Sequence, residues 1–323
     1  MPFSPESAFV ACRFAHFLAL MLLFGQSAFI AVLAPPKLRP PLHREGRYVL
    51  LGSAGLTALS ALVMVPIEAA QMGDGWQDAP RFDAWQAVLE TAFGQVWTWH
   101  LALSMGALML AVAVASAPRK TGIDRHRHWR MILLALVSAL LLASLGLVGH
   151  AAMHAGWRGV VQRLNHGAHL LSAAAWFGAL PPLISCLRRL IPIPDAAPDV
   201  RDVRDSNKAS DARDANRAVR RFSTMGHIAV GVVILTGIVN TALVLQGWPI
   251  HLQRPYEAML DLKIAVVAVM TAIAVYNRYR WVPAFKNRPE TALAALKRNT
   301  YLEIALGCAV LLLVAIFATD DPR

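Results

Sequence analysis

Histidine, the commonest metal ligand among protein side chains, recurs at matching positions along this chain. Of its eleven histidines, seven fall where one face of a membrane protein is expected: His16, His100, His150, His154, His166, His169 and His251. His150 and His154 have helical i,i+4 spacing. His166 and His169 have i,i+3 spacing, so the members of each pair lie on one face of a helix. At the ends of apolar helices, such pairs bring imidazoles together as metal and haem ligands do.

The segments that carry these histidines are long and apolar enough to cross a bilayer. The 323 residues are 56% hydrophobic and 16% charged, which is outside the range of ordinary soluble domains. Because unpaired backbone groups are costly in lipid, each apolar run of ~20 residues should form a helix. The expected fold is all-α, one integral membrane domain (1–323) with eight transmembrane helices near 8–34, 48–70, 96–117, 130–150, 164–187, 224–246, 259–280 and 300–319.

Lysine and arginine are concentrated in alternate connecting segments. The segments 35–47, 118–130, 188–221 and 278–298 hold 24 of the 31 basic residues. The positive-inside rule places these segments in the cytoplasm and both termini in the periplasm. The net charge of +11 follows from this topology, so we expect lipid around the protein and no nucleic-acid partner.

Two connecting segments have a composition of their own. The segment 188–221 alternates Asp with Arg and holds few apolar residues, which predicts a flexible cytoplasmic loop, most of it disordered or a fraying helix. The outer segment 71–95 contains a Gly-Asp-Gly-Trp turn at 73–76, then an amphipathic stretch beginning at Phe82. Trp97 and Trp99 are expected to anchor the next helix at the outer interface.

Ionisable side chains fall at one depth in the outer half of the predicted bundle. His16 lies ~12 Å along its helix at 1.5 Å per residue, a position that is costly for an ionisable group unless it is paired or faces a polar cavity. The expected pairings are Glu68 with Arg13, or Asp261 with Lys263. A single histidine is explained by one hydrogen bond between helices. Six from four helices are hard to explain in that way: His16, His100, His150, His154, His166 and His169.

Histidine together with methionine favours copper, because imidazole and thioether both suit this metal. We predict an outer copper site built from His150, His154, His166 and His169, and completed by His100, His16 or Met153. Cys12, four residues before His16, is either a thiolate ligand or a small buried core residue. In the cytoplasmic half, Met225, His227 and Glu303 are candidates for an inner station, and Lys263 for the same pathway.

Three functions fit such a site. A copper transporter would move Cu(I) or Cu(II) by a gradient or by handover from a chaperone, since the sequence has no ATP-binding loop, and it would not be an enzyme. A b-type haem redox protein is the alternative, with axial histidines such as His150 and His166. A metal-stabilised assembly or sensor subunit would bind copper without moving it.

Several motifs, in this order and spacing, resemble the CopD/PcoD family of copper resistance inner-membrane proteins. They are RFAHF at 13–17, GDGW at 73–76, WQAVL at 85–89, GHA at 149–151, NHGAHL at 165–170, AAAWFG at 173–178, RFS at 221–223, GH at 226–227, TG at 236–237 and LDLK at 260–263. Family members typically have Tyr-Gly before the last motif, where this chain has Tyr256 and Glu257.

This resemblance implies an eight-helix protein of the inner membrane of a Gram-negative bacterium that takes part in copper homeostasis. It implies movement of copper inward from the periplasm, together with a periplasmic copper chaperone of the CopC kind. The departure at Glu257 removes no candidate ligand.

Overall fold

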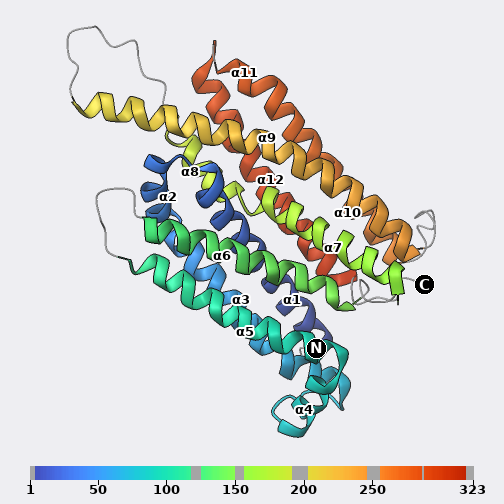
Figure 1. The fold of residues 1–323 in the computed structure, drawn as a ribbon. Coiled ribbons are helices and arrows are strands. Elements are labelled where there is room, and N and C mark those ends of the chain that lie inside the picture. Colours follow the sequence, from blue (N-terminus) through green and yellow to red (C-terminus); the bar gives the residue numbers. More distant parts are fainter. Residues whose placement is uncertain are drawn as a thin grey trace.

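The computed structural model describes residues 4–117, 125–149, 156–190, 203–245, 255–285 and 287–317, and every regular element in them is helical (Figure 1). Within these ranges, eight helices are long and apolar enough to cross a membrane: Pro5–Leu33, Arg47–Met72, Ala92–Ala115, Arg125–Leu147, Gly156–Leu187, Ala209–Leu245, Tyr256–Ala284 and Pro289–Phe317. The predicted all-α fold with eight membrane helices is therefore confirmed.

The spans are built from the following elements. They are α1 (Pro5–Ala28) with η1 (Phe29–Leu33), α3 (Arg47–Met72), α5 (Ala92–Ala115), α6 (Arg125–Ser144) with η3 (Leu145–Leu147), α7 (Gly156–Phe177) with α8 (Leu180–Leu187), α9 (Val203–Leu245), α10 (Pro255–Tyr276) with η5 (Asn277–Trp281) and α11 (Val282–Ala284), and α12 (Pro289–Phe317). Shorter elements connect them: η2 (Pro36–Leu38), α2 (Arg39–Glu45) and α4 (Phe82–Glu90).

Proline and glycine account for the break in the fifth span. Pro181 and Pro182 occupy the first turn of α8, where a missing N–H is tolerated, and they prevent α7 from continuing through that point. Gly178 and Ala179 form the turn between the two helices. This break shifts the path of the chain beside α1.

One expected loop is largely a helix. The segment 188–221 is expected to be disordered or a fraying helix, and the structure shows a helix from Val203, where α9 begins, that continues unbroken into the sixth span. Residues 191–202 lie outside the described ranges. The stretch 203–221 holds neither glycine nor proline, and Arg220 donates to Asn216 one turn earlier. Ala215 and Ala218 are fully buried. Alanine has a high helix propensity but low hydropathy, so this buried stripe does not register as an apolar face.

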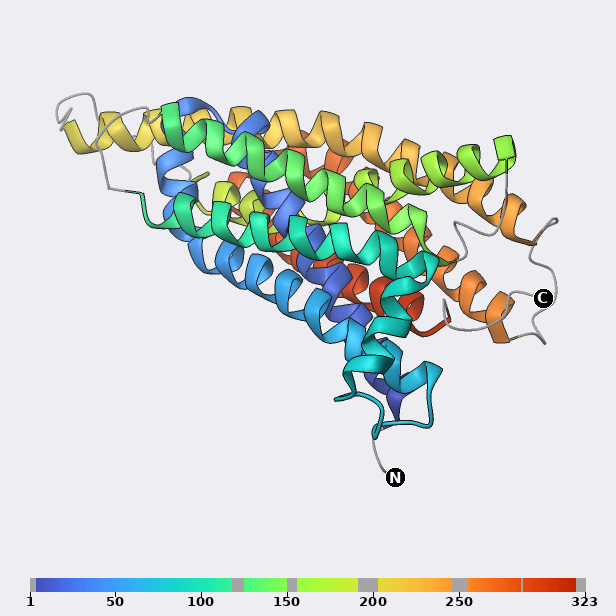
Figure 2. The ribbon, with the colours of Figure 1, turned by 60° about the horizontal axis from the view of Figure 1, so that its bottom comes forward.

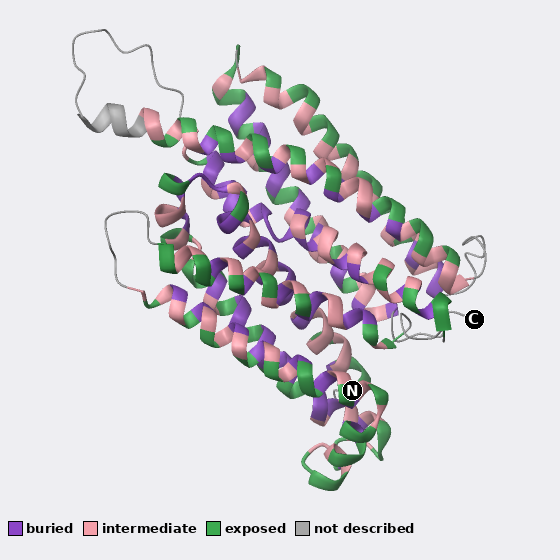
Figure 3. Ribbon diagram, in the orientation of Figure 1, coloured by how far each residue is buried: buried purple, intermediate pink, exposed green. Residues whose placement is uncertain are grey.

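The first helix is central to the bundle. α1 packs against α3, α6, α7 and α12, whereas α9 packs mainly on α7, and α10 on α12 (Figures 1 and 2). The α1 and α7–α8 spans are the most buried of the eight, and the α9 and α10 spans are the most exposed (Figure 3). The first residue of α1 and the last of α12 lie at the same end of the bundle as α4, which we call the α4 end. The opposite end carries α2 and α11 and is called the basic end.

Glycines permit direct backbone contact between α1 and the turn that joins α7 to α8. A Cβ atom added at Gly25 of α1 would lie 2.2 Å from the carbonyl carbon of Gly178, and one at Gly178 would lie 1.9 Å from the carbonyl oxygen of Met21. No side chain fits in either place. Backbone contact at this crossing fixes the position of α1 against the α7–α8 turn.

An ion pair fastens the basic end. Arg189, just after α8, pairs with Glu45 at the end of α2. Hydrogen bonding to this guanidinium holds the pKa of Glu45 below its ordinary value, although partial burial opposes the shift.

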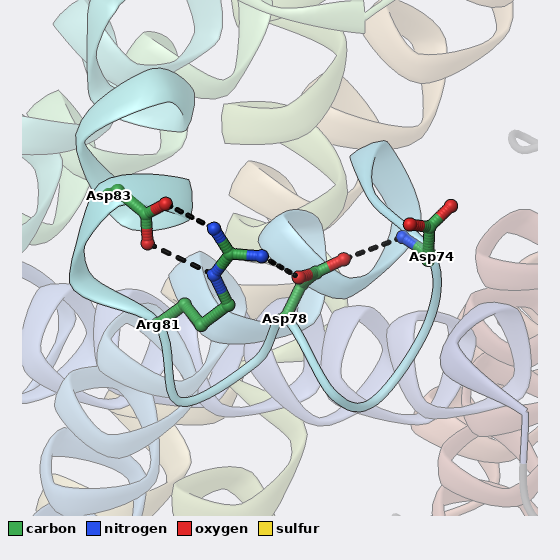
Figure 4. Close-up of polar contacts among 4 residues, drawn as sticks. All are labelled: Asp74, Asp78, Arg81 and Asp83. Carbon is green, nitrogen blue, oxygen red and sulfur yellow. Dashed lines mark hydrogen bonds and ion pairs between the residues drawn. The ribbon is translucent and has the colours of Figure 1, made fainter.

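At the other end, the connection from α3 to α4 is ordered by a carboxylate–arginine network (Figure 4). Asp78 accepts from the backbone N–H of Asp74 at 2.6 Å and pairs with Arg81 at 3.0 Å, and Arg81 also pairs with Asp83. Gly75 has a φ of +106°, a conformation that L side chains rarely adopt. The predicted turn at 73–76 and the amphipathic helix after it are both present.

The crossing of α1 with the α7–α8 turn provides a test of the fold. Gly25→Ala should destabilise the protein by about 1–3 kcal/mol or more, because the added methyl group overlaps the backbone of Gly178. The matched control is Gly52→Ala on α3, where an added Cβ meets nothing within 4 Å. Thermal unfolding in detergent measures both, and an unchanged midpoint for Gly25→Ala would contradict this packing.

Candidate metal centre

Two imidazoles meet inside the bundle. His16 of α1 and His100 of α5 place their Nε2 atoms 2.9 Å apart, with ring centroids separated by 5.0 Å. Both residues are 1% exposed. From the sequence, these two histidines are expected only to complete an outer site. In the structure they are direct neighbours. We call His16 and His100 the imidazole pair.

A serine holds the second nitrogen of each ring. Nδ1 of His16 lies 2.9 Å from Oγ of Ser60, and Nδ1 of His100 lies 2.8 Å from Oγ of Ser144. Each hydroxyl already donates its only hydrogen to a carbonyl of its own helix, at 2.5 Å for Ser60 and 2.8 Å for Ser144. Both serines are therefore acceptors toward histidine, and both Nδ1 atoms carry the hydrogen.

These tautomers leave two lone pairs that face each other. Each Nε2 of the imidazole pair is unprotonated when its ring is neutral, and two such nitrogens at 2.9 Å repel. A proton or a metal ion between them removes this repulsion, and so does a tautomer change in one ring, after which the two Nε2 atoms share an N–H···N hydrogen bond. A second ring nitrogen fixed by a hydrogen bond is also the usual arrangement of histidines that bind metals.

An aromatic wall encloses the pair. The indole of Trp97 stacks on His100, with centroids 4.6 Å apart and planes at 11°, and lies 5.6 Å from the ring of His16. Its Nε1 donates to the carbonyl of Ala61 at 2.8 Å. The expected role of Trp97 as an interface anchor is wrong, since the residue is 3% exposed, whereas Trp99 is 74% exposed as an anchor requires. The i,i+3 spacing of Trp97 and His100 is the signal that sequence reasoning missed.

A second group of imidazoles lies on α7. Nδ1 of His169 lies 3.0 Å from Oγ1 of Thr236 on α9, whose hydroxyl donates to a carbonyl of its own helix at 2.5 Å. His169 therefore shares the tautomer of the imidazole pair. The ring of His166 lies beside Gly146, two residues after Ser144, at a spacing of 3.7 Å from where a Cβ would stand on that glycine. Ser144 and the turn after it thus connect the two groups along the chain.

Two positively charged side chains interact electrostatically with this second group of imidazoles. Arg13 of α1 and Lys263 of α10 both interact electrostatically with His166, and Lys263 also with His169. Of the expected ion pairs, Arg13 and Glu68 attract each other through space, and each retains one buried atom without a hydrogen bond. The Nζ atom of Lys263 lies 5.8 Å from the ring centroid of Phe317.

The residues predicted for an inner pathway are separated. His227 and Glu303 line one cavity between α9, α10 and α12. Met225 packs against the hydrophobic core instead. Lys263 lies beside the last residue of α12, at the α4 end of the bundle.

Part of the predicted outer site falls outside the described ranges: His150, Met153, His154 and His251. Within those ranges, no three His, Cys, Asp or Glu side chains gather as a complete metal site. The described part of the chain therefore offers a two-nitrogen site at the imidazole pair, with His166 and His169 nearby.

Two family models match most of the chain. The model described as "Copper resistance protein D-like, N-terminal domain" matches residues 4–160, and the one described as "Copper resistance protein D" matches residues 216–317. The chain belongs to the copper resistance protein D family. The imidazole pair falls within the first match, and both His227 and Glu303 fall within the second.

Relatives agree with this assignment. The chain is 32% identical to "Inner membrane protein YebZ" of Escherichia coli over 97% of its own length and 98% of that protein. It is 27% identical to "Copper resistance protein D" of Pseudomonas syringae pv. tomato, over 97% and 96% of the two chains. It is also 26% identical to "Copper transport protein CutJ" of Bacillus subtilis, over 86% of this chain and 46% of that one. No solved structure matches.

The serines provide a test of the centre that leaves its ligands in place. Ser60→Ala or Ser144→Ala removes the acceptor that fixes one Nδ1–H, so Cu(I) affinity should fall about 10–100-fold with the stoichiometry retained. Competition with a chromophoric Cu(I) chelator measures this. The control is Ser138→Ala on α6, a fully buried serine whose hydroxyl bonds only to its own helix. Equal affinities in all three variants would show that these serines do not prepare the site.

Proposed function

We propose that this protein is a multi-pass inner-membrane protein of copper homeostasis that binds a copper ion between His16 and His100 and moves it inward across the membrane. The observation that supports the proposal is the pair of facing Nε2 atoms, each on a ring whose Nδ1 is already committed to a serine. Copper is chosen as the metal because of the family to which the chain belongs and the names of two relatives, copper resistance protein D and copper transport protein CutJ.

The chemistry of the pair suits Cu(I). Two neutral nitrogens add no charge, so a monovalent ion leaves the smallest charge to be buried in this enclosed site. Metal–imidazole bonds of roughly 2.0 Å would set the nitrogens ~4 Å apart for a linear ion, which requires the rings to separate by about 1 Å. Cys12 donates to the carbonyl of Ser60 at 3.3 Å, so a soft thiol lies beside the same serine that holds His16.

Entry is proposed from the α4 end. The chain segment that holds His150, Met153 and His154 joins η3 to α7, between Ser144 and His166 in sequence. These three residues, with His166 and His169, are proposed to take copper from a periplasmic chaperone of the CopC kind and to pass it to the imidazole pair. No chemical conversion is proposed, so the protein is not an enzyme in this account.

Removing the imidazole pair tests the proposal directly. The double variant His16→Ala and His100→Ala should lose one equivalent of copper per protein, measured by mass spectrometry of the purified protein, and should lose its copper phenotype. His126→Ala, an exposed histidine at the basic end of α6, is the control. His166→Ala with His169→Ala should remove a further share of the copper if the second group takes part in capture.

The same preparation distinguishes a haem protein. Between imidazoles 2.9 Å apart and enclosed by Trp97 there is no space for a macrocycle, so no Soret band is expected from the pair. A Soret band with split α and β bands, lost on replacement of His166, would establish the haem alternative. Full copper stoichiometry in the double variant would refute the pair as the site.

The direction of movement depends on the orientation of the bundle. Reporter fusions should place Ser206 of α9 in the cytoplasm and Gly75 in the periplasm, because the basic segments lie at the end that carries Ser206. A periplasmic signal at Ser206 would invert the orientation and make the imidazole pair part of a cytoplasmic half.

A further inference from the structure

A second polar site lies beside α9, α10 and α12, away from the imidazole pair. A cavity of about 110 Å³ lies between α9, α10 with η5, α12 and the α7–α8 span, and it extends toward the basic end. At ~30 Å³ per molecule in the liquid, several waters fit in it. Its wall is mostly apolar, with polar side chains from α9, α10 with η5, and α12: Ser223, His227, Thr271, Asn277, Arg278, Thr300 and Glu303.

Three of these side chains have a buried atom with no hydrogen-bond partner: Nε2 of His227, Oγ1 of Thr271 and Oε1 of Glu303. Nδ1 of His227 donates to the carbonyl of Ser223 at 2.7 Å, so its Nε2 is an acceptor that needs a donor. Glu303 is 4% exposed and stands midway along α12. Unsatisfied polar atoms on one cavity indicate a ligand that can pair with them.

The charges around the cavity point to a proton rather than a second metal ion. Of the residues that line it, only His227, Arg278 and Glu303 titrate or carry charge, and the ring of Tyr279 packs edge-on against His227 with centroids 6.2 Å apart. Arg278 donates to Oγ of Ser223 at 2.6 Å and contributes a positive charge, which opposes a metal cation. A neutral Glu303 avoids the cost of a buried, unpaired carboxylate. The two side chains make no direct hydrogen bond, so the O–H of Glu303 would reach Nε2 of His227 through water in the cavity.

We propose that this cavity is a proton-binding site, in which the carboxyl of Glu303 and the imidazole of His227 share one proton through water, and that loading and release of this proton is coupled to copper movement. When Glu303 gives up the proton to His227, a carboxylate and an imidazolium result. The imidazolium then passes the proton to water in the cavity and returns to its neutral form. The coupling rests on the proposed copper function, but the proton site does not.

Infrared difference spectroscopy of the copper-free protein tests the proton site alone. The wild type should show the carbonyl stretch of a protonated carboxylic acid that shifts in deuterated buffer. Glu303→Gln should remove this band, and His227→Gln should move it by changing its hydrogen bond. Glu290→Gln, an exposed carboxyl near the start of the same helix, is the matched control and should leave it unchanged. A wild-type band that persists in Glu303→Gln would overturn the proposal.

Copper flux into proteoliposomes tests the coupling. An imposed pH gradient should change the wild-type flux several-fold, and Glu303→Gln should abolish this response while still binding copper at the imidazole pair. A pH response of equal size in Glu303→Gln would overturn the coupling. If the wild type binds no copper but the infrared band is present, the copper function fails and the proton site stands.

Discussion

The hydrogen of a serine hydroxyl determines what the centre of this protein can bind. Ser60 and Ser144 each donate to their own helix and accept from an imidazole, so His16 and His100 present lone pairs to each other across 2.9 Å. Two facing lone pairs repel, and a cation between them would relieve the repulsion. Four helices, α1, α3, α5 and α6, hold the rings and serines in place, and the indole of Trp97 stacks on His100.

The position of α1 connects this pair to the rest of the molecule. α1 carries His16, and at Gly25 it contacts the α7–α8 turn. It also carries Arg13, whose charge interacts with His166. A change in ring spacing of about 1 Å on metal binding would therefore displace α1, which packs against α3, α6, α7 and α12. In the second half, α12 packs against α1 and also carries Glu303. This packing is a physical route by which the proposed copper site and the proposed proton site could be coupled.

Much of the fold follows from the sequence, because hydrophobic length and the cost of unpaired backbone in lipid leave few alternatives. The eight spans were predictable for this reason. The common depth of His16 and His100 was also predictable, from counting along helices of known direction. Their direct contact was not, because it depends on the rotation of α1 and α5 about their axes, which apolar residues on all sides do not determine.

The features that could not be predicted from the sequence depend on alanine, glycine, serine and tryptophan. The surroundings of these residues in the fold are not evident from the sequence. The helix before Arg221 depends on alanines that hydropathy does not register as apolar. The roles of Ser60 and Ser144 depend on which histidine faces them, and the contact of Trp97 with His100 is signalled in the sequence only by their i,i+3 spacing. Glycine at positions 25 and 178 signals a close crossing only when the opposite backbone is known.

Nitrogen NMR of histidine-labelled protein loaded with Cu(I) tests the central claim most directly, since this ion is diamagnetic. The account predicts that His16 and His100 keep a hydrogen on Nδ1, and that both Nε2 signals move to positions typical of metal-bound nitrogen. Nε2 atoms that keep a bonded hydrogen in the copper-loaded protein would contradict it.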